Sequence, residues 1–380
     1  MGRILVEKDI EAAIRGGAVF ACGGGGWADH GRMLGTAAVN AGQPELVSID
    51  ELDPDDFVAT AAAIGAPAST TPWQMLGVDY VNAVRLVEAE LGAPIAGLII
   101  GQNGKSSTLN AWLPSAMLGT KVVDAVGDLR AHPTGDMGSI GLANSPMPMI
   151  QSAVGGNRAN NAYIELVVRG ATAKISPILR TAADMSGGFI ASCRNPVPAS
   201  YVRKHAALGG ITMALDLGAA IIKAESKGGK AVIDAVCRQN PGEIIGSGRV
   251  TKKAVVYTKE SIDVGTLTLG KGASACTLHV MNEYMAVEDS GGKRLATYPD
   301  VITTFNPDGV PMSVGEIHEG QELVILRVAR EHIPLSSSVT DPSVYPICEK
   351  ALGISIADYA LGNRRRKKPG KKQKTKKGRK

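Results

Sequence analysis

Apolar residues recur along the first 130 positions in two patterns that alternate. One pattern has helical spacing, and residues 79–91 show it most clearly. The other is a short apolar run, such as 95–100, which is typical of a strand buried on both faces. The expected helices are 7–15, 33–40, 79–91 and 113–118, and the expected strands are 18–22, 46–49, 95–100 and 121–126. Strands that alternate with helices predict an α/β domain with a mostly parallel sheet covered on both faces.

The pattern changes in the second half of the chain. Strands are expected at 163–168 and 172–176, and helices at 202–208, 211–224 and 229–239. From residue 242 to 335, turn-forming residues separate short alternating segments, which predicts an antiparallel barrel or sandwich. We therefore expect an α/β domain with glycine-rich loops at 1–165, then a helical connector and a mainly-β, barrel-like domain with a few helices at 166–362, and finally a disordered basic tail at 363–380.

Composition and charge modify this description only at the C-terminus. The 380 residues are 44% hydrophobic and 20% charged, which is typical of a folded protein of about two domains. The net charge of +5 comes from residues 364–380, which hold 12 Lys or Arg and no acid. The rest of the chain carries 29 bases against 36 acids. The tail therefore predicts weak, non-selective binding of polyanions, and the remainder of the chain does not resemble a nucleic-acid-binding surface.

Two further features indicate the cellular compartment. No apolar run approaches the roughly 18 residues that a membrane span needs, and the N-terminal stretch carries charges throughout, unlike a signal peptide. The five cysteines are scattered along the chain and form no CxxC pair, which favours reduced thiols. We therefore expect a cytoplasmic protein that makes no membrane contact.

The first glycine-rich loop imitates a dinucleotide-binding turn. Gly23, Gly25 and Ala28 satisfy the pattern G-x-G-x-x-A after an expected strand, and Asp50 lies about where a ribose-binding acid belongs. Residues 27–30, however, put bulk and charge where a helix should open. A tight turn whose backbone amides approach a small polar ligand is the stronger interpretation, and nucleotide binding remains the alternative.

The densest group of polar side chains follows the last strand expected in the α/β region. Residues 124–136 contain Asp124, Asp128, Arg130 and His132. Carboxylates and imidazoles can act as bases, an arginine can pair with an anion, and a histidine can carry a proton or bind a metal. The plain structural interpretation is that these side chains cap the loop and pair with one another.

The first glycine loop adds Asp29 and His30 to these candidates. If the strands at 18–22 and 121–126 are neighbours, both loops open at the same edge of the sheet. The combined side chains could then activate water, directly or through a divalent metal. His30, Asp124 and His132 are the candidate metal ligands, although no two histidines have HxH or HxxxH spacing.

One polar pair interrupts an apolar segment of the second half. Asn282 and Glu283 lie between apolar positions, and a buried polar pair needs partners. We therefore expect this pair to reach into the interface between the two domains. Cys193, which lies beside Arg194 but has no histidine near it in the sequence, is interpreted as a buried structural thiol.

Several short motifs, taken in order, resemble a known family. They are the GGGG turn, the segments GQNGKSSTLNAWLPSAMLGTKVVDAVGDLRAHPTGDMGSIGL and NEYMAVEDSGGKRLATYPDVITTFNPDG, and EGQELVILRV. Together they resemble the family once catalogued as uncharacterised family 917, now associated with S-methyl thiohydantoin desulfurase and often encoded beside hydantoinase/oxoprolinase genes. The resemblance covers roughly residues 8–355. It implies an α/β domain joined to a barrel-like domain, and hydrolysis of a small cyclic amide or its thio-derivative with methanethiol as leaving group.

The resemblance also selects residues. The substrate-binding candidates are Gly23, Gly24, Gly25, Gly26, Asn103, Gly104, Asn282 and Glu283, together with Asp29 and His30 from the loop itself; the catalytic candidates are Asp124, Arg130 and His132, together with Asp128 from the polar group at 124–136. The sequence departs from the family pattern at four positions. Trp27 and Val126 stand where an Asp is common, Thr134 where a Glu is common, and His132 where an aromatic residue is common. These departures fall in the candidate site and leave the substrate open.

The resulting hypothesis is a hydrolase that attacks a hydantoin-like or thiohydantoin-type ring with activated water. A small heterocyclic substrate and further copies of the chain in a homo-oligomer are the expected partners, and a divalent metal is the candidate cofactor. Two alternatives stay open. One is a nucleotide-binding module that uses the first glycine loop, and the other is an accessory subunit of a hydantoinase/oxoprolinase-type complex.

Overall fold

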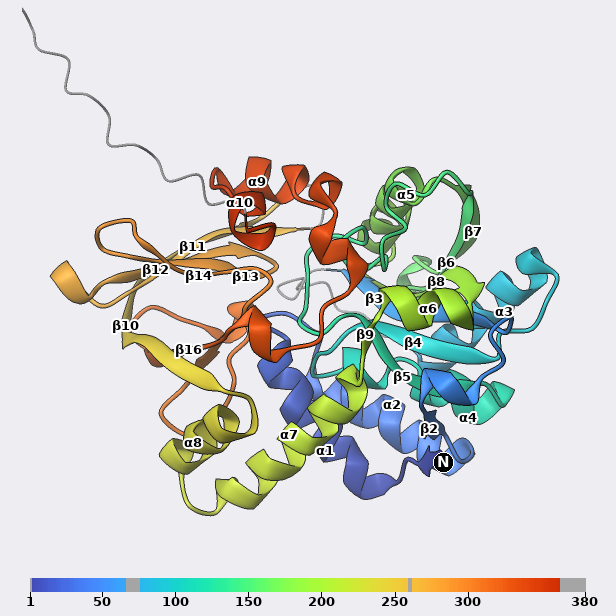
Figure 1. Ribbon diagram of the computed structural model, residues 1–380, viewed down its shortest axis with the longest axis horizontal. Coiled ribbons are helices and arrows are strands. Elements are labelled where there is room, and N and C mark those ends of the chain that lie inside the picture. Colours follow the sequence, from blue (N-terminus) through green and yellow to red (C-terminus); the bar gives the residue numbers. More distant parts are fainter. Residues whose placement is uncertain (1, 66–75, 259–261, 363–380) are drawn as a thin grey trace, which may run out of the picture.

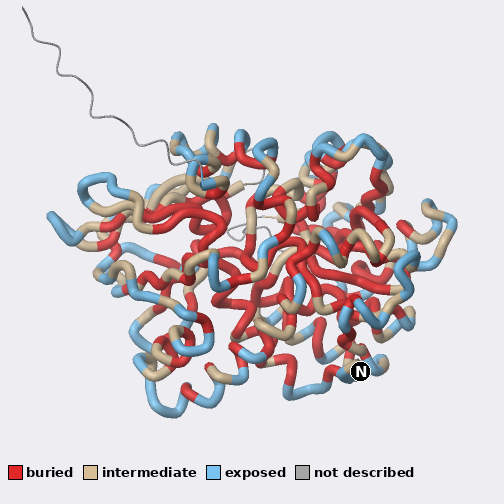
Figure 2. The backbone as a smooth tube through the Cα atoms, viewed as in Figure 1, coloured by how far each residue is buried: buried red, intermediate tan, exposed pale blue. Residues whose placement is uncertain are grey.

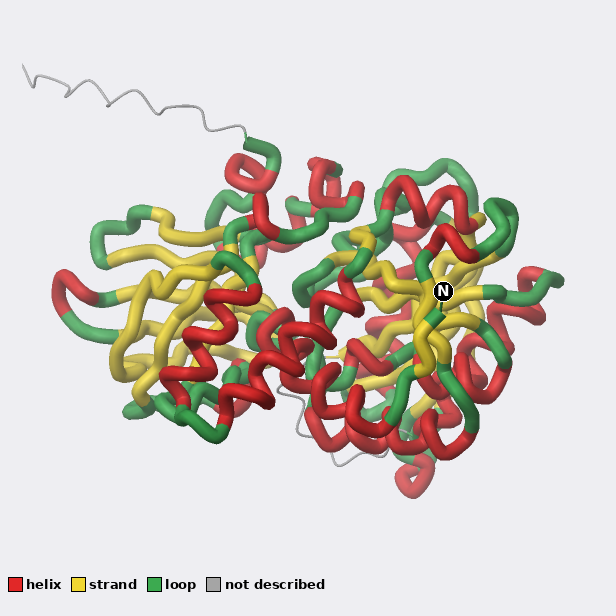
Figure 3. The backbone as a smooth tube through the Cα atoms, turned by 60° about the horizontal axis from the view of Figure 1, so that its bottom comes forward, coloured by secondary structure: helices red, strands yellow, loops and turns green. Residues whose placement is uncertain are grey.

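The computed structural model describes residues 2–65, 76–258 and 262–362 (Figure 1). The expected disordered tail at 363–380 lies outside these residues. Within the described residues, one sheet has nine strands and a second has seven. Figure 3 shows the strands as two groups, with most of the helices around the group that contains the N-terminus. The chain therefore has an α/β part followed by a mainly antiparallel part, as predicted.

The first sheet combines a parallel and an antiparallel half. Its strands are β1 (Arg3–Ile4), β2 (Glu45–Val47), β3 (Phe57–Gly65), β4 (Gly97–Gln102), β5 (Lys121–Asp128), β6 (Met149–Gly155), β7 (Ile164–Gly170), β8 (Phe189–Pro198) and β9 (Ala207–Leu208). Their order is β1-β2-β5-β4-β3-β8-β6-β7, with β9 paired to β5. Strands β2, β5, β4 and β3 are mutually parallel, and β8, β6 and β7 continue the sheet antiparallel. The carboxyl ends of β3, β4 and β5 therefore meet at one edge.

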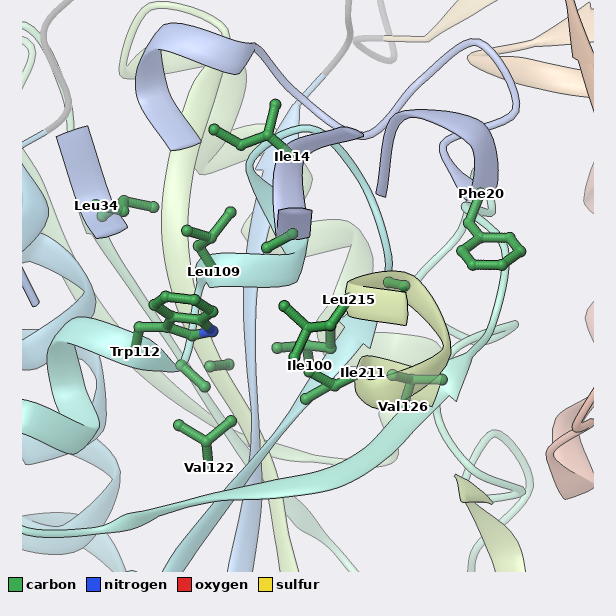
Figure 4. Packing of buried hydrophobic residues seen from close by; sticks show 14 of the residues in the cluster. Ile14, Phe20, Leu34, Ile100, Leu109, Trp112, Val122, Val126, Ile211 and Leu215 are labelled. Carbon is green, nitrogen blue, oxygen red and sulfur yellow. The ribbon is translucent and has the colours of Figure 1, made fainter. Parts of the chain in front are cut away.

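Helices cover both faces of this sheet. They are α1 (Glu7–Phe20), α2 (Ala28–Ala41), α3 (Gly77–Leu91), α4 (Trp112–Leu118), α5 (Thr172–Met185), α6 (Ala199–His205) and α7 (Gly210–Glu225). The next helix, α8 (Gly229–Gln239), packs against α7 instead. Successive residues of a strand face opposite sides, so Ile100 belongs to the core under α1, α4 and α7 (Figure 4). Ile99 belongs to a second core cluster, on the other face of the sheet. The apolar runs of the parallel strands are thus buried on both sides.

The strand expected at 18–22 is wrong, because helix α1 continues to Phe20. Two glycines inside this helix allow close packing: Gly16 faces α7, and Gly17 faces the loop after β4, where a Cβ would lie 2.3 Å from the carbonyl oxygen of Gly104. A Cβ on Gly16 would lie 1.8 Å from the carbonyl oxygen of Ala214, and one on Gly218 would lie 1.8 Å from that of Ala12. A short apolar run cannot be assigned to helix or strand by its hydrophobicity alone.

The strand expected at 172–176 is also wrong, because these residues form the beginning of α5. The helix expected at 202–208 is shorter at its C-terminal end: α6 ends at His205, and the next residues form β9 beside β5. Strands β3, β6 and β8 were not predicted. Strand β3 is rich in Ala, and polar residues interrupt β6 and β8, so all three lack the continuous run of large apolar residues that marks β4.

The second sheet is antiparallel and forms a half-barrel. Its strands are β10 (Gly242–Tyr257), β11 (Asp263–Leu269), β12 (Cys276–Met281), β13 (Glu283–Asp289), β14 (Arg294–Thr297), β15 (Val301–Phe305) and β16 (Glu322–Val328), in the order β14-β13-β12-β11-β10-β16-β15. Two short helices, α9 (Pro346–Leu352) and α10 (Ala357–Ala360), follow it. Figure 2 shows that buried residues lie mainly in the interior, whereas exposed residues lie mainly along the outer loops and turns. None of the helices in the described ranges has the length and apolarity to cross a membrane.

Candidate functional site

A cavity of about 80 Å³ lies where the carboxyl ends of β3, β4 and β5 approach the start of β13. Both sheets contribute to its wall. The wall includes residues of the glycine turn after α1 and residues of the loop after β5, so these two loops share one cavity. Its polar wall residues include Gln102, Ser107, Asn110, His132, Arg180, Arg194, Asn195, Asn282 and Glu283.

The glycine turn reaches the cavity through Gly25 and Gly26. It follows helix α1, and the positive φ of Gly25 (77°) and Gly26 (79°) turns the chain back against the loop after β4. The backbone oxygen of Gly25 accepts a hydrogen bond from the amide of Ser106 (3.1 Å). A Cβ on Gly24 would lie 2.3 Å from Oε1 of Glu283. The turn is therefore built for close approach of backbone to backbone and of backbone to Glu283.

This geometry removes the structural context of a dinucleotide-binding turn, which requires a strand before the glycines. Here a helix precedes them. Asp50, the residue expected to bind a ribose, is exposed and forms an ion pair with Arg203 (2.6 Å). The dinucleotide interpretation of this loop depended on a strand before the glycines, and that strand is absent from the described structure.

His132 and Asp128 form the buried end of the loop after β5. The His132 imidazole lines the cavity, and its Nδ1 lies 3.9 Å from Oδ2 of Asp128. Burial, reinforced by the positive charges of Arg194 and Arg130, lowers the pKa of His132 to about 3, so the ring is neutral. No described residue forms a hydrogen bond with Nδ1 of His132 or with Oδ1 of Asp128.

The Asp128 carboxyl is completely buried. Burial raises its pKa to about 7, against the opposing effects of Tyr298 and Arg130. The Tyr298 hydroxyl donates a hydrogen bond of 2.5 Å to its Oδ2. Asp128 can therefore change its ionisation state near neutral pH, directly behind an imidazole that faces the cavity.

Glu283 enters the cavity from the second sheet. It is the first residue of β13, and Asn282 before it has a positive φ of 56° and accepts a hydrogen bond from the amide of Asp263 (2.9 Å). Burial raises the pKa of Glu283 to about 8, although Arg130 and Arg180 oppose this, so the group is mostly protonated at neutral pH. Its Oε2 has no hydrogen-bond partner among the described residues. The pair thus reaches the contact between the two sheets.

Two arginines that were not among the predicted site residues also line the cavity. Arg180 projects from α5 and donates to the backbone oxygen of Pro133 (3.0 Å), and Arg194 projects from β8 and donates to that of Gly135 (2.9 Å). Burial is the main cause that lowers the pKa of each guanidinium. For Arg194 it lowers the pKa to about 10. Neither belongs to a recognisable motif; for Arg194, the signal available in the sequence was its position as a cationic residue inside an otherwise uncharged segment, SGGFIASCRNP.

Asp124 and Arg130 lie close to the cavity in sequence but do not belong to its wall. The Asp124 carboxylate accepts hydrogen bonds from the amides of Ile211 (2.9 Å) and Thr212 (3.0 Å), which caps the N-terminus of α7. Arg130 is fully buried and donates to the backbone oxygens of Asp300 (2.9 Å) and Tyr284 (3.0 Å). One side chain thus joins helix α7 to the sheet, and the other joins the two sheets.

The remaining candidates do not belong to the cavity wall. Asp29 is exposed and pairs with Arg32, whereas His30 contacts the Tyr80 hydroxyl (3.1 Å), and burial lowers its pKa to about 4. Asn103 is buried and donates to the backbone oxygens of Leu129 and Gly210 (both 3.1 Å).

Gly104 contacts the glycine turn rather than the cavity, because a Cβ there would lie 2.4 Å from Cα of Gly25. The three candidate metal ligands, His30, Asp124 and His132, do not converge. In the described ranges, no group of three or more His, Cys, Asp or Glu side chains could hold a metal ion. The described His, Cys, Asp and Glu side chains therefore do not fit a metal centre.

Comparisons with known proteins agree with the sequence resemblance. Residues 8–162 match the S-Me-THD-like, N-terminal domain, and residues 171–335 match the S-Me-THD-like, C-terminal domain. A crystal structure of a protein from Chromobacterium violaceum is similar to this chain, with a TM-score of 0.69 at 21% identity, covering 93% of this chain and 96% of that one. At this identity the structural similarity shows the fold. No curated protein matches the chain.

Proposed function

Because the chain belongs to the S-Me-THD-like family along both of its halves, we propose that it hydrolyses a small thiohydantoin-type or cyclic amide ring with activated water. One observation carries the proposal: a neutral imidazole and a protonated carboxyl line the same cavity. An acceptor and a donor of protons in one small cavity are what hydrolysis of a C=N or C=O group requires.

His132 is the proposed base. When its Nδ1 carries the proton and faces Asp128, its Nε2 is free to accept one from water. The separation of 3.9 Å between Nδ1 and Oδ2 has to shorten by about 1 Å to form a hydrogen bond. An ionised Asp128 would then stabilise the imidazolium that forms, which compensates for the low intrinsic basicity of the buried ring.

Glu283 is the proposed acid. With an S-methyl thiohydantoin, water adds to the ring carbon that bears the methylthio group, His132 takes one proton, and Glu283 gives its proton to the ring nitrogen. The carbon–sulfur bond then breaks, methanethiolate leaves with the proton held by His132, and the second proton of the water returns to Glu283. The products are the hydantoin ring and methanethiol, and both side chains recover their starting states.

The test is methanethiol release by the purified chain from S-methyl thiohydantoins, compared between the unmodified protein, H132Q and D128N. We expect both variants to keep the fold and to lose about 10²–10⁴-fold in kcat, the usual contribution of a positioned acid or base. His318→Gln, at an exposed histidine away from the cavity, is the matched control. Full activity of H132Q would refute the role of the imidazole, and no release by the unmodified chain alone would favour the accessory-subunit alternative.

A further inference from the structure

Strand β7 ends the strand order of the first sheet and has an open edge. Its residues pair with β6 on one side, and it lies along the outer margin of the molecule beside α5 (Figure 1). Within the described ranges, no backbone-to-backbone hydrogen bond joins residues 164–170 to any element other than β6. The outward N–H and C=O groups of such an edge are a template for pairing with another strand.

The usual devices that block pairing at an edge are missing from β7. Its register with β6 is regular from Ile164 to Gly170, without a bulge, and the strand contains neither proline nor lysine. Its two charged side chains, Glu165 and Arg169, are both exposed. They lie on the same face of the sheet, because they are four residues apart in a strand. Whether these charges repel or attract an approaching strand depends on the register of that strand.

A second copy of the chain matches this edge in one symmetric register. Two antiparallel edge strands can be related by a two-fold axis perpendicular to the sheet, so each register has a central residue. When the axis passes through Val167, Glu165 lies opposite Arg169 of the partner subunit. Leu166 then lies opposite Val168 of the partner subunit, so apolar side chains meet as well. Registers centred on 165 or 169 would place like charges opposite each other.

The existing contacts of the two charged side chains leave capacity for this pairing. Arg169 donates from Nε to Oε1 of Glu90 (3.0 Å) and from Nη2 to the backbone oxygen of the same residue (3.0 Å). Glu165 accepts a hydrogen bond from the Tyr163 hydroxyl. A guanidinium has more donors, and a carboxylate more lone pairs, than these bonds use. Each side chain can therefore keep its present partner and add one across the edge.

The same pairing would cover apolar surface that β7 leaves half-exposed. Leu166 and Val168 are half-buried against the cluster that includes Leu179 of α5, and Val167 is half-buried against the core on the other face. A strand on the open side of β7 would shield these side chains further, and burial of apolar surface favours association. The edge thus combines backbone groups ready to pair, matching charges and apolar side chains.

We propose that two copies of the chain associate through β7, antiparallel and centred on Val167, so that their first sheets become one continuous sheet. This assigns an interface to the homo-oligomer expected from the sequence. None of residues 164–170 lines the cavity, so the interface does not depend on the proposed hydrolysis.

The test is sedimentation velocity of the full chain over a range of concentrations, for the unmodified protein, E165R and R169E. We expect the unmodified chain to form dimers. Each variant places like charges opposite each other twice, so the dissociation constant of the dimer should rise about a hundredfold or more. R249E, at an exposed arginine of the second sheet that pairs with Glu322, is the matched control and should dimerise as the unmodified chain does.

A mixture of the two variants tests the register itself. E165R presents two arginines and R169E presents two glutamates, so one copy of each restores both pairs of opposite charges. We expect the mixture to dimerise although neither variant does so alone. Melting curves check that both variants are folded.

A second measurement applies if a charge variant does not fold. Side chains directly opposite each other in an antiparallel pair have Cβ atoms about 5 Å apart. In dilute oxidising solution, V167C should therefore form a covalent dimer, and V256C, at an exposed valine of β10, should not.

Several outcomes would overturn the proposal. One is a chain that stays monomeric up to about 100 µM, because specific protein interfaces of ordinary size have dissociation constants in the micromolar range or below. Dimerisation that is unchanged in folded E165R and R169E would show that the copies meet through another surface. Failure of the folded variants to dimerise when mixed, or of V167C to cross-link, would exclude the register centred on Val167.

Discussion

The buried carboxyl of Glu283 gives a quantitative prediction that does not depend on knowing the substrate. Its pKa is raised from the ordinary 4.5 to about 8 by burial. Below pH 4.5 both the folded and the unfolded chain hold the proton. Between pH 4.5 and 8 the unfolded chain releases it while the folded chain retains it, so the contribution of Glu283 to stability is lost as the pH rises through this window.

The perturbation is E283Q, which keeps the size of the side chain and cannot titrate. At about 1.4 kcal/mol per pH unit, the unmodified protein should lose roughly 3 kcal/mol between pH 5 and pH 8 through this group. We therefore expect the free energy of unfolding of E283Q, minus that of the unmodified protein, to rise by roughly 3 kcal/mol over the same range. Any fixed cost of placing an amide at this position cancels in the comparison between the two pH values.

The assay is urea unfolding of both proteins at pH 5 and pH 8, with Glu331→Gln, at an exposed glutamate, as the control for the chemical change. E283Q should at the same time lose about 10²–10⁴-fold in kcat, because an amide has no acidic proton to give. A difference in unfolding free energy that stays constant from pH 5 to pH 8 would mean that Glu283 is already ionised in the folded protein. It would then be unable to act as the acid.

Three further predictions concern the same cavity. The rate should depend on pH as a bell, rising through about pH 7 as Asp128 ionises and falling above about pH 8 as Glu283 loses its proton; a profile flat from pH 6 to 9 would contradict both assignments. Gly138→Ala should reduce kcat about 10²-fold or more with little change in the melting temperature, because a Cβ there would lie 2.3 Å from Nε2 of His132 and displace the ring. Arg130→Lys should lower the free energy of unfolding in urea by about 1–3 kcal/mol, because an ammonium cannot reach both backbone oxygens that the guanidinium bonds; an unchanged midpoint would show that the joint is dispensable.

The sequence was sufficient for the parts of the fold in which hydrophobicity and local geometry agree. Strand β4 contains an apolar run at 98–100, β5 contains three valines, and the helix expected at 79–91 lies within α3. Prediction failed where contacts between residues far apart in the sequence determine the secondary structure. Residues 18–20 could form a strand or a helix by their apolarity, and only the glycine-mediated contact of α1 with α7 selects the helix. Small-residue strands such as β3 have no local signal and form because their neighbours pair with them.

The candidate site shows the same division. The loop after β5 and the Asn282–Glu283 pair stood out as polar residues within apolar sequence, and the structure places His132, Asn282 and Glu283 in one cavity. Asp124 is equally polar but caps a helix that begins more than eighty residues later, which no pattern near it could indicate. Arg194 lies in a segment without a motif, and its direction depends on a shift in strand pairing.

Arg130 donates its hydrogen bonds to backbone oxygens, and this affects which substitutions the family can accept. Its guanidinium bonds carbonyl groups at positions 284 and 300, and every amino acid supplies a carbonyl. Substitutions at these two positions therefore leave the acceptors of this joint in place, even when they alter the side chains around Glu283. The half-barrel can thus change the side chains that it presents to the cavity while its attachment to the first sheet persists.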